Sequence, residues 1–435
     1  MLEPQSTVLF VLLIALFGML MWRTLAARRA AFRVLAACLA FVPAMVFGVL
    51  SVNKYYGYYQ TWGAMLADFT QQGASAATQL PHVELAAGSR SGTLDGSRTH
   101  LELAQRQGYL MRTTVTGQRS GITRVVYVYL PPQYFQPAYR GYRFPVIELI
   151  HGQPGEPQDW INVVGVTRAF DRLLADKLAQ PAVLLMPDAN GGARISLQCL
   201  NQAGGPQDLT YLAVDLPAQV ARILRVSRPG PAWAVAGYSE GGFCAANMAL
   251  RYPNRYGFAG VLSGYFIPLD NQLAGTGRPV SPFGGDDRLR DENTPLDELP
   301  AAAVIPRFWL GAGAADGQDV LIAERFWQEL RSRQPDAPLT LTPGSGHTMT
   351  TWRAQIPSML TWMTPRLARA AQPLTTARPG KNSTVAVKAA NRPDAISGRL
   401  YAVDGGTGRE NGPRGRAQPG VSDISNTSPL PRLAL

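Results

Sequence analysis

Hydrophobic positions follow two different patterns along the chain. Near the N-terminus, residues 6–22 and 34–52 form two apolar runs that contain no charged residue. As helices, both can cross a hydrocarbon core of about 30 Å, the first only just. From residue 109 onward, short apolar runs alternate with longer segments whose apolar residues recur at helical spacing. The pattern therefore predicts an apolar N-terminal part and a larger part built of alternating strands and helices.

The two apolar runs predict a membrane anchor over residues 1–56. Four arginines lie between the runs, within residues 23–33. By the positive-inside rule this connection stays cytoplasmic, so the chain after residue 52 faces outward and the protein is a two-helix protein of the cell membrane. The alternative is a cleaved signal peptide, which two consecutive spans with the positive charge between them disfavour.

Residues 109–365 are predicted to form one α/β domain with a mostly parallel central sheet. The expected strands are 109–116, 124–130, 145–150, 182–186, 232–236, 258–263, 307–310 and 339–342. The expected helices are 167–179, 213–224, 242–251, 320–333 and 352–369. Residues 57–108 are interpreted as a juxtamembrane connector, and residues 366–435, rich in Gly, Pro, Arg, Ser and Thr, as a disordered basic tail.

A candidate nucleophile lies where one of these strands meets a helix. Ser239 is the centre of the sequence Gly-Tyr-Ser-Glu-Gly, which follows the strand 232–236 and opens the helix 242–251. Glycines on both sides allow a tight turn that exposes the serine oxygen above the sheet. The alternative is a serine in an ordinary glycine turn.

The base and the acid are expected after the nucleophile in the chain. Of the four histidines only His347 follows Ser239, and it lies in a glycine-rich loop between a strand and a helix. Asp316 stands at the carboxyl end of the strand 307–310 and is the preferred acid. Asp319 is its rival, although it is also placed to cap the next helix. His347 would accept the serine proton, and the acid would orient the imidazole.

Two backbone amides are needed to stabilise the negative charge of an acyl-transfer intermediate. The residue after the nucleophile, Glu240, offers one. The loop after the strand 145–150 offers the other, and we select the amide of Gln153. His151 in the same loop is then interpreted as a structural residue of the turn and not as the base.

Four segments resemble the putative-esterase family of α/β-hydrolases: HGQPGEPQDW, LLMPDANGG, WAVAGYSEGGFCAANMAL and GSGHTMTTWRAQIP. The family includes feruloyl esterases, siderophore esterases, S-formylglutathione hydrolases and mycolyltransferases, and the resemblance covers about residues 109–365. It implies an α/β-hydrolase fold, a triad of Ser239, His347 and Asp316, and an oxyanion hole from Gln153 and Glu240. The N-terminal anchor and the tail depart from the soluble members.

The cysteines, histidines and charged residues bear on three further questions: disulfide formation, metal or cofactor binding, and nucleic-acid binding. Cys199 and Cys244 both fall in the predicted outer domain, and we expect a disulfide between them, with two buried free thiols as the alternative. Four scattered histidines predict neither a metal site nor a cofactor. The formal net charge is +11, but residues 57–365 hold equal numbers of acidic and basic groups. A nucleic-acid partner is therefore not expected.

The sequence thus predicts a membrane-anchored, extracytoplasmic serine esterase that acts on a small-molecule or lipid ester through an acyl-enzyme. Acyl transfer to a sugar or glycerol hydroxyl is the first alternative. A non-catalytic module that binds the cell envelope is the second, since a fold alone does not determine function.

Overall fold

The computed structural model describes residues 3–59, 61–69, 82–84, 98–192, 196–269, 272–273 and 279–371. From residue 372 onward, the tail predicted to be disordered lies outside the described residues, as do parts of the predicted connector.

A nine-stranded sheet forms the centre of the larger domain, in the order β1-β2-β3-β5-β4-β6-β7-β10-β11. Its strands are β1 (His82–Glu84), β2 (Tyr109–Thr116), β3 (Thr123–Leu130), β4 (Val146–Ile150), β5 (Val183–Pro187), β6 (Gly230–Tyr238), β7 (Tyr256–Leu262), β10 (Arg307–Gly313) and β11 (Leu339–Thr342). The six strands from β5 to β11 are mutually parallel, whereas β3 pairs antiparallel with both β2 and β5. A short hairpin of β8 (Gln272–Leu273) and β9 (Pro279–Val280) stands apart from the sheet.

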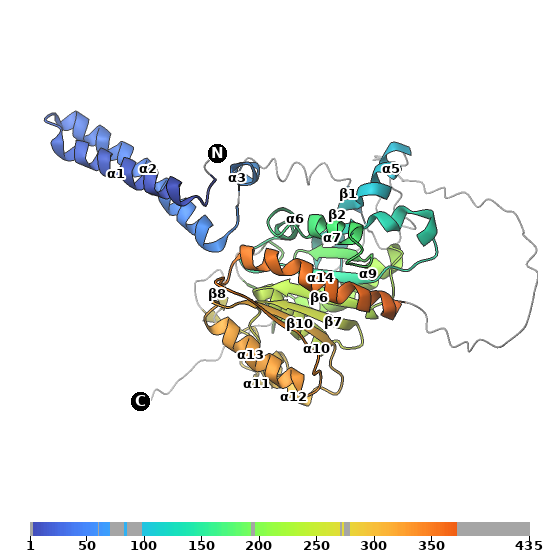
Figure 1. Ribbon diagram of the computed structural model, residues 1–435. Helices are drawn as coiled ribbons and strands as arrows, with labels where there is room; N and C mark the ends of the chain where they lie inside the picture. Colours follow the sequence, from blue (N-terminus) through green and yellow to red (C-terminus); the bar gives the residue numbers. More distant parts are fainter. Residues whose placement is uncertain are drawn as a thin grey trace, which may run out of the picture. The chain divides into compact units, whose positions relative to one another are not determined.

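Helices cover both faces of this sheet (Figure 1). The helices are α1 (Thr7–Ala26), α2 (Ala30–Tyr56), α3 (Trp62–Phe69), α5 (Arg98–Gln107), α6 (Asp159–Asn162), α7 (Val166–Ala175), α8 (Asp208–Thr210), α9 (Leu216–Ile223), α10 (Glu240–Arg251), α11 (Asp287–Asp291), α12 (Pro295–Ala301), α13 (Gln318–Arg331) and α14 (Met349–Ala371). Short 3-10 turns, η1 (Pro132–Phe135) and η2 (Pro137–Tyr139), precede β4, and a π-helical turn, η3 (Tyr211–Asp215), precedes α9.

Two hydrophobic clusters, one on each face, form the core. Residues of α7 and α14 pack on one face, and residues of α9, α10, α12 and α13 pack on the other. Every residue of β4 and β5 is buried, as a parallel strand between two helical layers requires. The predicted α/β fold with a mostly parallel sheet is confirmed.

The structure differs from the sequence interpretation at both ends of this domain. The segment 57–108, interpreted as a connector, contains α3, α5 and the edge strand β1, which pairs with β2. A three-residue strand is too short to give a periodic signal, and its partner is needed to define it. At the other end α14 continues to Ala371, six residues beyond the expected boundary.

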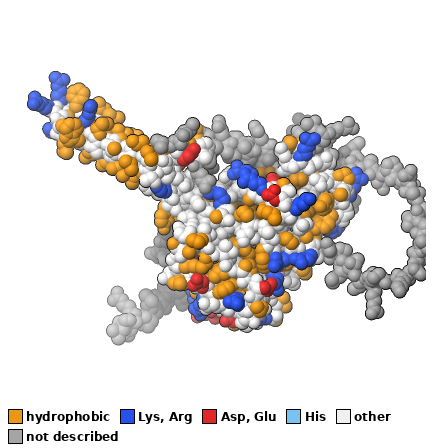
Figure 2. Space-filling model, viewed as in Figure 1, with side chains coloured by type: hydrophobic (Ala, Val, Ile, Leu, Met, Phe, Trp, Pro, Cys, Tyr) orange, Lys and Arg blue, Asp and Glu red, His pale blue; other side chains and the backbone are white. Residues whose placement is uncertain are grey.

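The two N-terminal helices form a hairpin whose outer surface is apolar (Figure 2). The ring of Phe10 on α1 packs against Phe47 on α2, with centroids 5.3 Å apart. Both helices are long and apolar enough to span a membrane, and α1 has no buried residue, unlike the core helix of a soluble protein. By length and composition alone, a signal sequence near the N-terminus would pass the same test.

A buried carboxyl group lies in the middle of the sheet. Glu148 on β4 is fully buried, and its Oε2 accepts a hydrogen bond of 2.9 Å from the hydroxyl of Tyr256. Its second oxygen, Oε1, has no hydrogen-bond partner among the described residues. Burial raises the pKa of Glu148 to about 8, and the Tyr256 hydrogen bond only partly opposes this. The side chain is therefore neutral at pH 7.

Glu148 should make the protein less stable as the pH rises. The folded state binds this proton more tightly than the unfolded chain does. The contribution of the protonated Glu148 to the free energy of unfolding is therefore complete below pH 4.5 and is lost as the pH rises through about 8. The slope is at most about 1.4 kcal/mol per pH unit. Replacing Glu148 with Gln should remove this component and make the variant the more stable protein at pH 9.

Thermal unfolding of the full chain in detergent, followed by tryptophan fluorescence from pH 5 to pH 9, measures the effect. The exposed Glu329 on α13 provides a matched control, Glu329→Gln, which should keep the wild-type pH dependence. Parallel curves for the wild type and Glu148→Gln would show that Glu148 does not titrate in this range.

Candidate active site

The turn between β6 and α10 forces Ser239 into an unusual backbone conformation. Its φ of 56° and ψ of −123° fall in a region of backbone conformation that residues other than glycine rarely occupy. The main-chain amide of Ser239 donates to Leu262 O at 2.9 Å, and its carbonyl accepts from Gly242 N at 2.9 Å. These bonds hold the strained turn at the carboxyl end of the strand.

Close backbone approaches explain the two glycines of this turn. A Cβ on Gly237 would lie 2.0 Å from the carbonyl oxygen of Gly241, and a Cβ on Gly241 would lie 2.1 Å from that of Ile150. No larger residue fits at either position without moving the backbone. The Gly-x-Ser-x-Gly pattern is thus a packing requirement of the turn that presents Ser239.

His347 lies in the loop between β11 and α14 and faces Ser239. Its Nε2 is 2.9 Å from Ser239 Oγ, and its Nδ1 is 3.0 Å from Asp316 Oδ1. The ionised carboxylate can only accept, so in the neutral imidazole Nδ1 carries the proton and Nε2 accepts from the serine hydroxyl. The ring of Trp352 meets the imidazole edge to face at 5.0 Å and restricts its rotation. Three residues distant in sequence therefore form one continuous hydrogen-bonded line.

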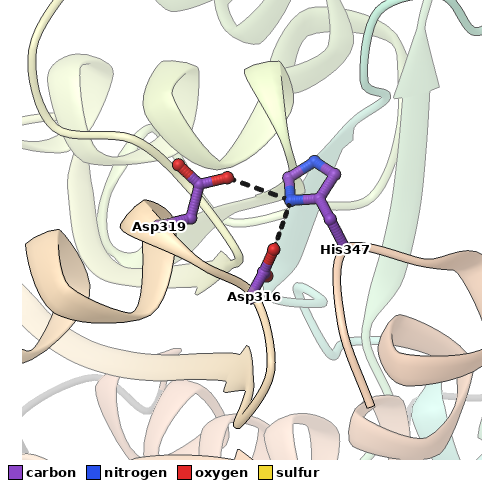
Figure 3. A group of neighbouring side chains, drawn as sticks. All are labelled: Asp316, Asp319 and His347. Atoms are coloured by element: carbon purple, nitrogen blue, oxygen red, sulfur yellow. Dashed lines mark hydrogen bonds and ion pairs between the residues drawn. The ribbon is translucent and has the colours of Figure 1, made fainter.

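Asp319 also reaches the same imidazole nitrogen (Figure 3). Its Oδ2 lies 3.1 Å from His347 Nδ1, nearly the distance of Asp316. The two carboxylates differ in burial, because the side chain of Asp316 is 1% exposed and that of Asp319 is 30% exposed. Asp319 stands in the first turn of α13, whereas Asp316 lies in the loop three residues after the end of β10. The sequence posed these two aspartates as alternatives, and the structure brings both to the histidine.

These carboxylates determine the protonation of His347. Burial alone would lower the pKa of the imidazole, but hydrogen bonds and charge attraction from Asp316 and Asp319 raise it to about 9. The imidazole is therefore mostly protonated at pH 7. If His347 acts as a base, activity should increase with pH toward about 9.

The same three side chains are the one group among the described residues with ligand atoms close enough for a metal ion, within 4.8 Å of one another. A cation on His347 Nδ1 would displace the proton that directs Nε2 toward Ser239. We therefore interpret the cluster as a proton-transfer arrangement. The structure offers no separate set of ligands in the described part of the chain.

Of the predicted oxyanion residues, Glu240 directly follows the nucleophile, and Gln153 directly follows Gly152, which lies beside the serine. Glu240 is the first residue of α10, and the loop of Gly152 and Gln153 passes directly beside the serine. A Cβ on Gly152 would lie only 3.1 Å from Ser239 Cβ, which leaves the loop in contact with the turn. The side-chain oxygen of Gln153 accepts from Asn190 Nδ2 at 2.9 Å, which fixes the loop.

His151 occupies a structural position, as the sequence interpretation expected. It is fully buried, with Nδ1 donating to Gly152 O at 2.8 Å and Nε2 accepting from the amide of Ala189 at 3.0 Å. Since both ring nitrogens have partners inside the protein, neither is available to substrate.

The sequence did not predict the ion pair and hydrogen bonds that hold the loop of Asp188 to Gly191 next to His151 and Gln153. The guanidinium of Arg124 forms a buried ion pair with Asp208 and donates to the carbonyl oxygen of Ala189. The carboxylate of Asp188 accepts from the amides of Asn190 and Gly191 at 3.1 and 2.7 Å. The Asp-x-x-Gly sequence could have indicated this second turn. The ion pair joins residues 84 positions apart and left no local signal.

A cavity of about 420 Å³ with both polar and apolar lining residues adjoins the loop that contains Gln153. Its lining includes Gln153, Pro154, Asn190, Arg112 and Tyr127. Arg112 and Tyr127 lie opposite each other on β2 and β3, so they project on the same face of the sheet. A larger cavity of about 520 Å³ is lined instead by Arg143, Arg222, Arg255 and their neighbours and includes none of the predicted site residues.

A disulfide joins Cys199 to Cys244, five residues beyond Ser239 on α10. It is the pair expected from the sequence, and it ties the segment after the Asp188 turn to the helix that begins at Glu240. The side chain of Glu240 strengthens the same connection, since its carboxylate accepts from the hydroxyl of Ser196. Glu240 is buried, and this burial raises the pKa of its carboxyl group.

Comparison with known proteins gives three findings. A model described as Putative esterase matches residues 118–363. An uncharacterized protein of Corynebacterium glutamicum is 22% identical over 348 residues, which cover 77% of this chain and 76% of that protein. The MPT51/MPB51 antigen of Mycobacterium tuberculosis is 35% identical over 98 residues, which cover 22% of this chain and 32% of that protein.

Among solved structures, a ferulic acid esterase superposes with a TM-score of 0.51 at 20% identity, covering 60% of this chain and 99% of that one. At this identity the likeness concerns the fold. It agrees with the central sheet and helical layers described above.

Proposed function

Because the chain belongs to the putative esterase family and is an esterase-type hydrolase, we propose that it cleaves a carboxylic ester with Ser239 as nucleophile. His347 is the general base, and Asp316 orients and stabilises its imidazole. The observation that carries this proposal is the continuous line from Ser239 Oγ through His347 to Asp316, with distances of 2.9 and 3.0 Å.

The reaction follows from the positions of the donors and acceptors. Ser239 Oγ attacks the ester carbonyl as its proton passes to His347 Nε2, and the carbonyl oxygen becomes negatively charged. The amides of Gln153 and Glu240 stabilise this oxygen. The alcohol then leaves with the proton from His347, which yields an acyl-Ser239 intermediate. Water attacks this intermediate with His347 again as base and releases the acid.

We propose that Asp316 is the principal acid and Asp319 an auxiliary charge. Asp316 is nearly fully buried, so its interaction with the imidazole is little screened by water. Asp319 is partly exposed, and its contribution to a developing imidazolium is correspondingly weaker. Only one N–H is present at Nδ1, so the two carboxylates share it unequally.

The test of this proposal is hydrolysis of p-nitrophenyl esters of increasing chain length by the purified full chain in detergent. We expect release of p-nitrophenol together with the free acid. No turnover of any ester would contradict the proposal and would favour the alternative of a non-catalytic envelope-binding module.

Acyl transfer remains the second candidate, supported by the resemblance to mycolyltransferases and by the hydrogen-bonding side chains of Arg112 and Asn190 in the cavity beside Gln153. Adding glycerol or a disaccharide to the assay distinguishes the two reactions. Hydrolysis predicts that the acid remains the main product, and transfer predicts a new ester.

We further propose that α1 and α2 are retained as a membrane anchor with the catalytic domain outside the cytoplasm. The apolar outer surface of the hairpin and the arginines around its turn support this orientation. The Cys199–Cys244 disulfide also fits an oxidising compartment.

Protease treatment of intact cells should therefore digest the catalytic domain, and the mass of the purified protein should include residues 1–56. The same protease on opened cells provides the control for a resistant fold. A mature protein that starts beyond residue 56 would indicate a cleaved signal peptide. A domain protected only in intact cells would contradict the outward orientation.

A further inference from the structure

The chain leaves the second apolar helix through a fixed turn, which we call the junction (residues 53–59). The side-chain oxygen of Asn53 accepts from the amide of Tyr59 at 2.7 Å, and its Nδ2 donates to the Tyr59 carbonyl at 2.9 Å. Gln5 Nε2 donates to the same carbonyl at 3.1 Å. Asn53 is buried, so these bonds are protected from water. The junction is therefore an ordered continuation of α2.

The junction contacts both loops that carry the proposed catalytic groups. Gly57, with a φ of +70°, approaches Thr350 so closely that a Cβ would lie 2.4 Å from Thr350 Oγ1. Thr350 is in the first turn of α14, three residues after His347. The hydroxyl of Tyr58 donates to the carbonyl oxygen of Pro154 at 3.5 Å, and Pro154 directly follows Gln153. The histidine loop and the oxyanion loop thus both contact the residues that follow α2.

Packing and charge reinforce the Tyr58 contact. The Tyr58 ring packs against the hydrophobic cluster that contains Trp160, Tyr238 and Trp352. Tyr238 precedes the nucleophile, and its ring stacks on that of Trp352 with centroids 4.6 Å apart. Tyr58 is half-buried, and this burial, with the charge of Asp159, raises the pKa of its phenol. Tyr58 therefore packs on the same hydrophobic cluster that contains the residue preceding the nucleophile.

Tyr58 follows so closely after the end of α2 that the helix cannot move far from the loop that Tyr58 contacts. α2 ends at Tyr56, and Tyr58 lies two residues later, a span of at most about 7 Å. Tyr55 and Tyr56 are 70% and 44% exposed. Tyrosines at the end of an apolar span favour the headgroup layer of a bilayer. If α2 spans the membrane, the loop that contains Gln153 and Pro154 therefore lies close to the lipid headgroups.

We propose that the hairpin holds the mouth of the catalytic site against the membrane surface, and that the substrate is an amphipathic lipid ester drawn from the bilayer. Pro154 belongs both to the junction contact and to the cavity of about 420 Å³. Arg112 and Asn190 in its lining offer hydrogen-bond donors to a lipid headgroup, while the acyl chains stay in the bilayer. This inference rests on the proposed esterase function and adds the source of the substrate.

Two variants of the full chain test this proposal in phosphatidylcholine and phosphatidylglycerol vesicles. The first has a flexible Gly-Ser linker inserted between Gly57 and Tyr58, which separates α2 from Tyr58 and from the loop that Tyr58 contacts. The matched control has the same linker after Gly406, in the tail. Each protein is labelled at Ser239 with a fluorescent fluorophosphonate, and a nitroxide on the lipid headgroup serves as quencher. Unlabelled samples are assayed with a dissolved p-nitrophenyl ester and with diacylglycerol in the vesicles.

The wild type and the tail-linker control should be quenched by the headgroup nitroxide and should hydrolyse both esters. The junction-linker variant should lose quenching and, because a longer tether lowers the effective concentration of lipid at the site, cleave diacylglycerol about tenfold more slowly. Its activity on the dissolved ester should stay at the wild-type level, which also shows that it folds. An unquenched wild type, or equal diacylglycerol turnover in both linker variants, would overturn the proposal. Absence of any label on Ser239 would instead contradict the esterase function itself.

Discussion

Replacing Ser239 with alanine should reduce kcat for ester hydrolysis by a factor on the order of 10⁶, because no other group in the site can form the acyl-enzyme. The remaining rate would come from the oxyanion amides acting on bound water. Alanine occupies the space of serine without its oxygen, so the turn at φ 56° and the packing against Gly152 should be preserved. The unfolding temperature should therefore change little.

The measurement is steady-state hydrolysis of a p-nitrophenyl ester by the full chain in detergent, with thermal unfolding of the same samples. Ser332, exposed at the end of α13, provides the matched control, and Ser332→Ala should keep wild-type activity. If the Ser239→Ala variant keeps more than a small fraction of the wild-type rate, Ser239 is not the nucleophile.

The two aspartates should respond very differently to the same substitution. Asp316→Asn should lower kcat by about 10⁴, because an amide can donate to Nδ1, which holds the imidazole in the wrong tautomer and leaves Nε2 unable to accept the serine proton. Asp319→Asn removes only a partly exposed charge, so kcat at the optimal pH should fall by no more than about tenfold.

The pH dependence of kcat/KM shows in which direction Asp319 shifts the pKa of His347. The carboxylates favour the imidazolium and raise the pKa of His347 to about 9, so the basic, active form is scarce at pH 7. Asp319→Asn weakens this effect, and the rising limb of kcat/KM should move to lower pH. Activity at pH 7 relative to that at pH 9 should therefore increase. A profile identical to the wild type would show that Asp319 does not act on His347, and a severe loss in Asp319→Asn alone would exchange the two roles.

Local sequence information was sufficient to select Ser239 and His347, which the structure brings within hydrogen-bond distance of each other. The strand, the Gly-x-Ser-x-Gly turn and the helix are contiguous, and the close approaches at Gly237 and Gly241 explain why these residue types recur in that order. His347 could be selected because it alone follows Ser239 among four histidines. Each choice depended on a short segment or on chain order.

Contacts between distant segments could not be predicted in the same way. The Arg124–Asp208 ion pair and the contact of Tyr58 with Pro154 depend on how separate segments come together in the folded chain. The approach of both Asp316 and Asp319 to one nitrogen depends on the angle at which α13 begins after β10. Sequence spacing proposes such candidates but does not fix side-chain positions within an ångström.

Mass spectrometry of the fluorophosphonate adduct tests the central claim most directly. The full chain in detergent is treated with the probe, digested, and mapped for the added phosphonyl group. We predict a single modified site, Ser239, with modification slowed by a competing ester substrate. Labelling at another residue, or no labelling of a protein that hydrolyses esters, would contradict the assignment of Ser239 as the nucleophile.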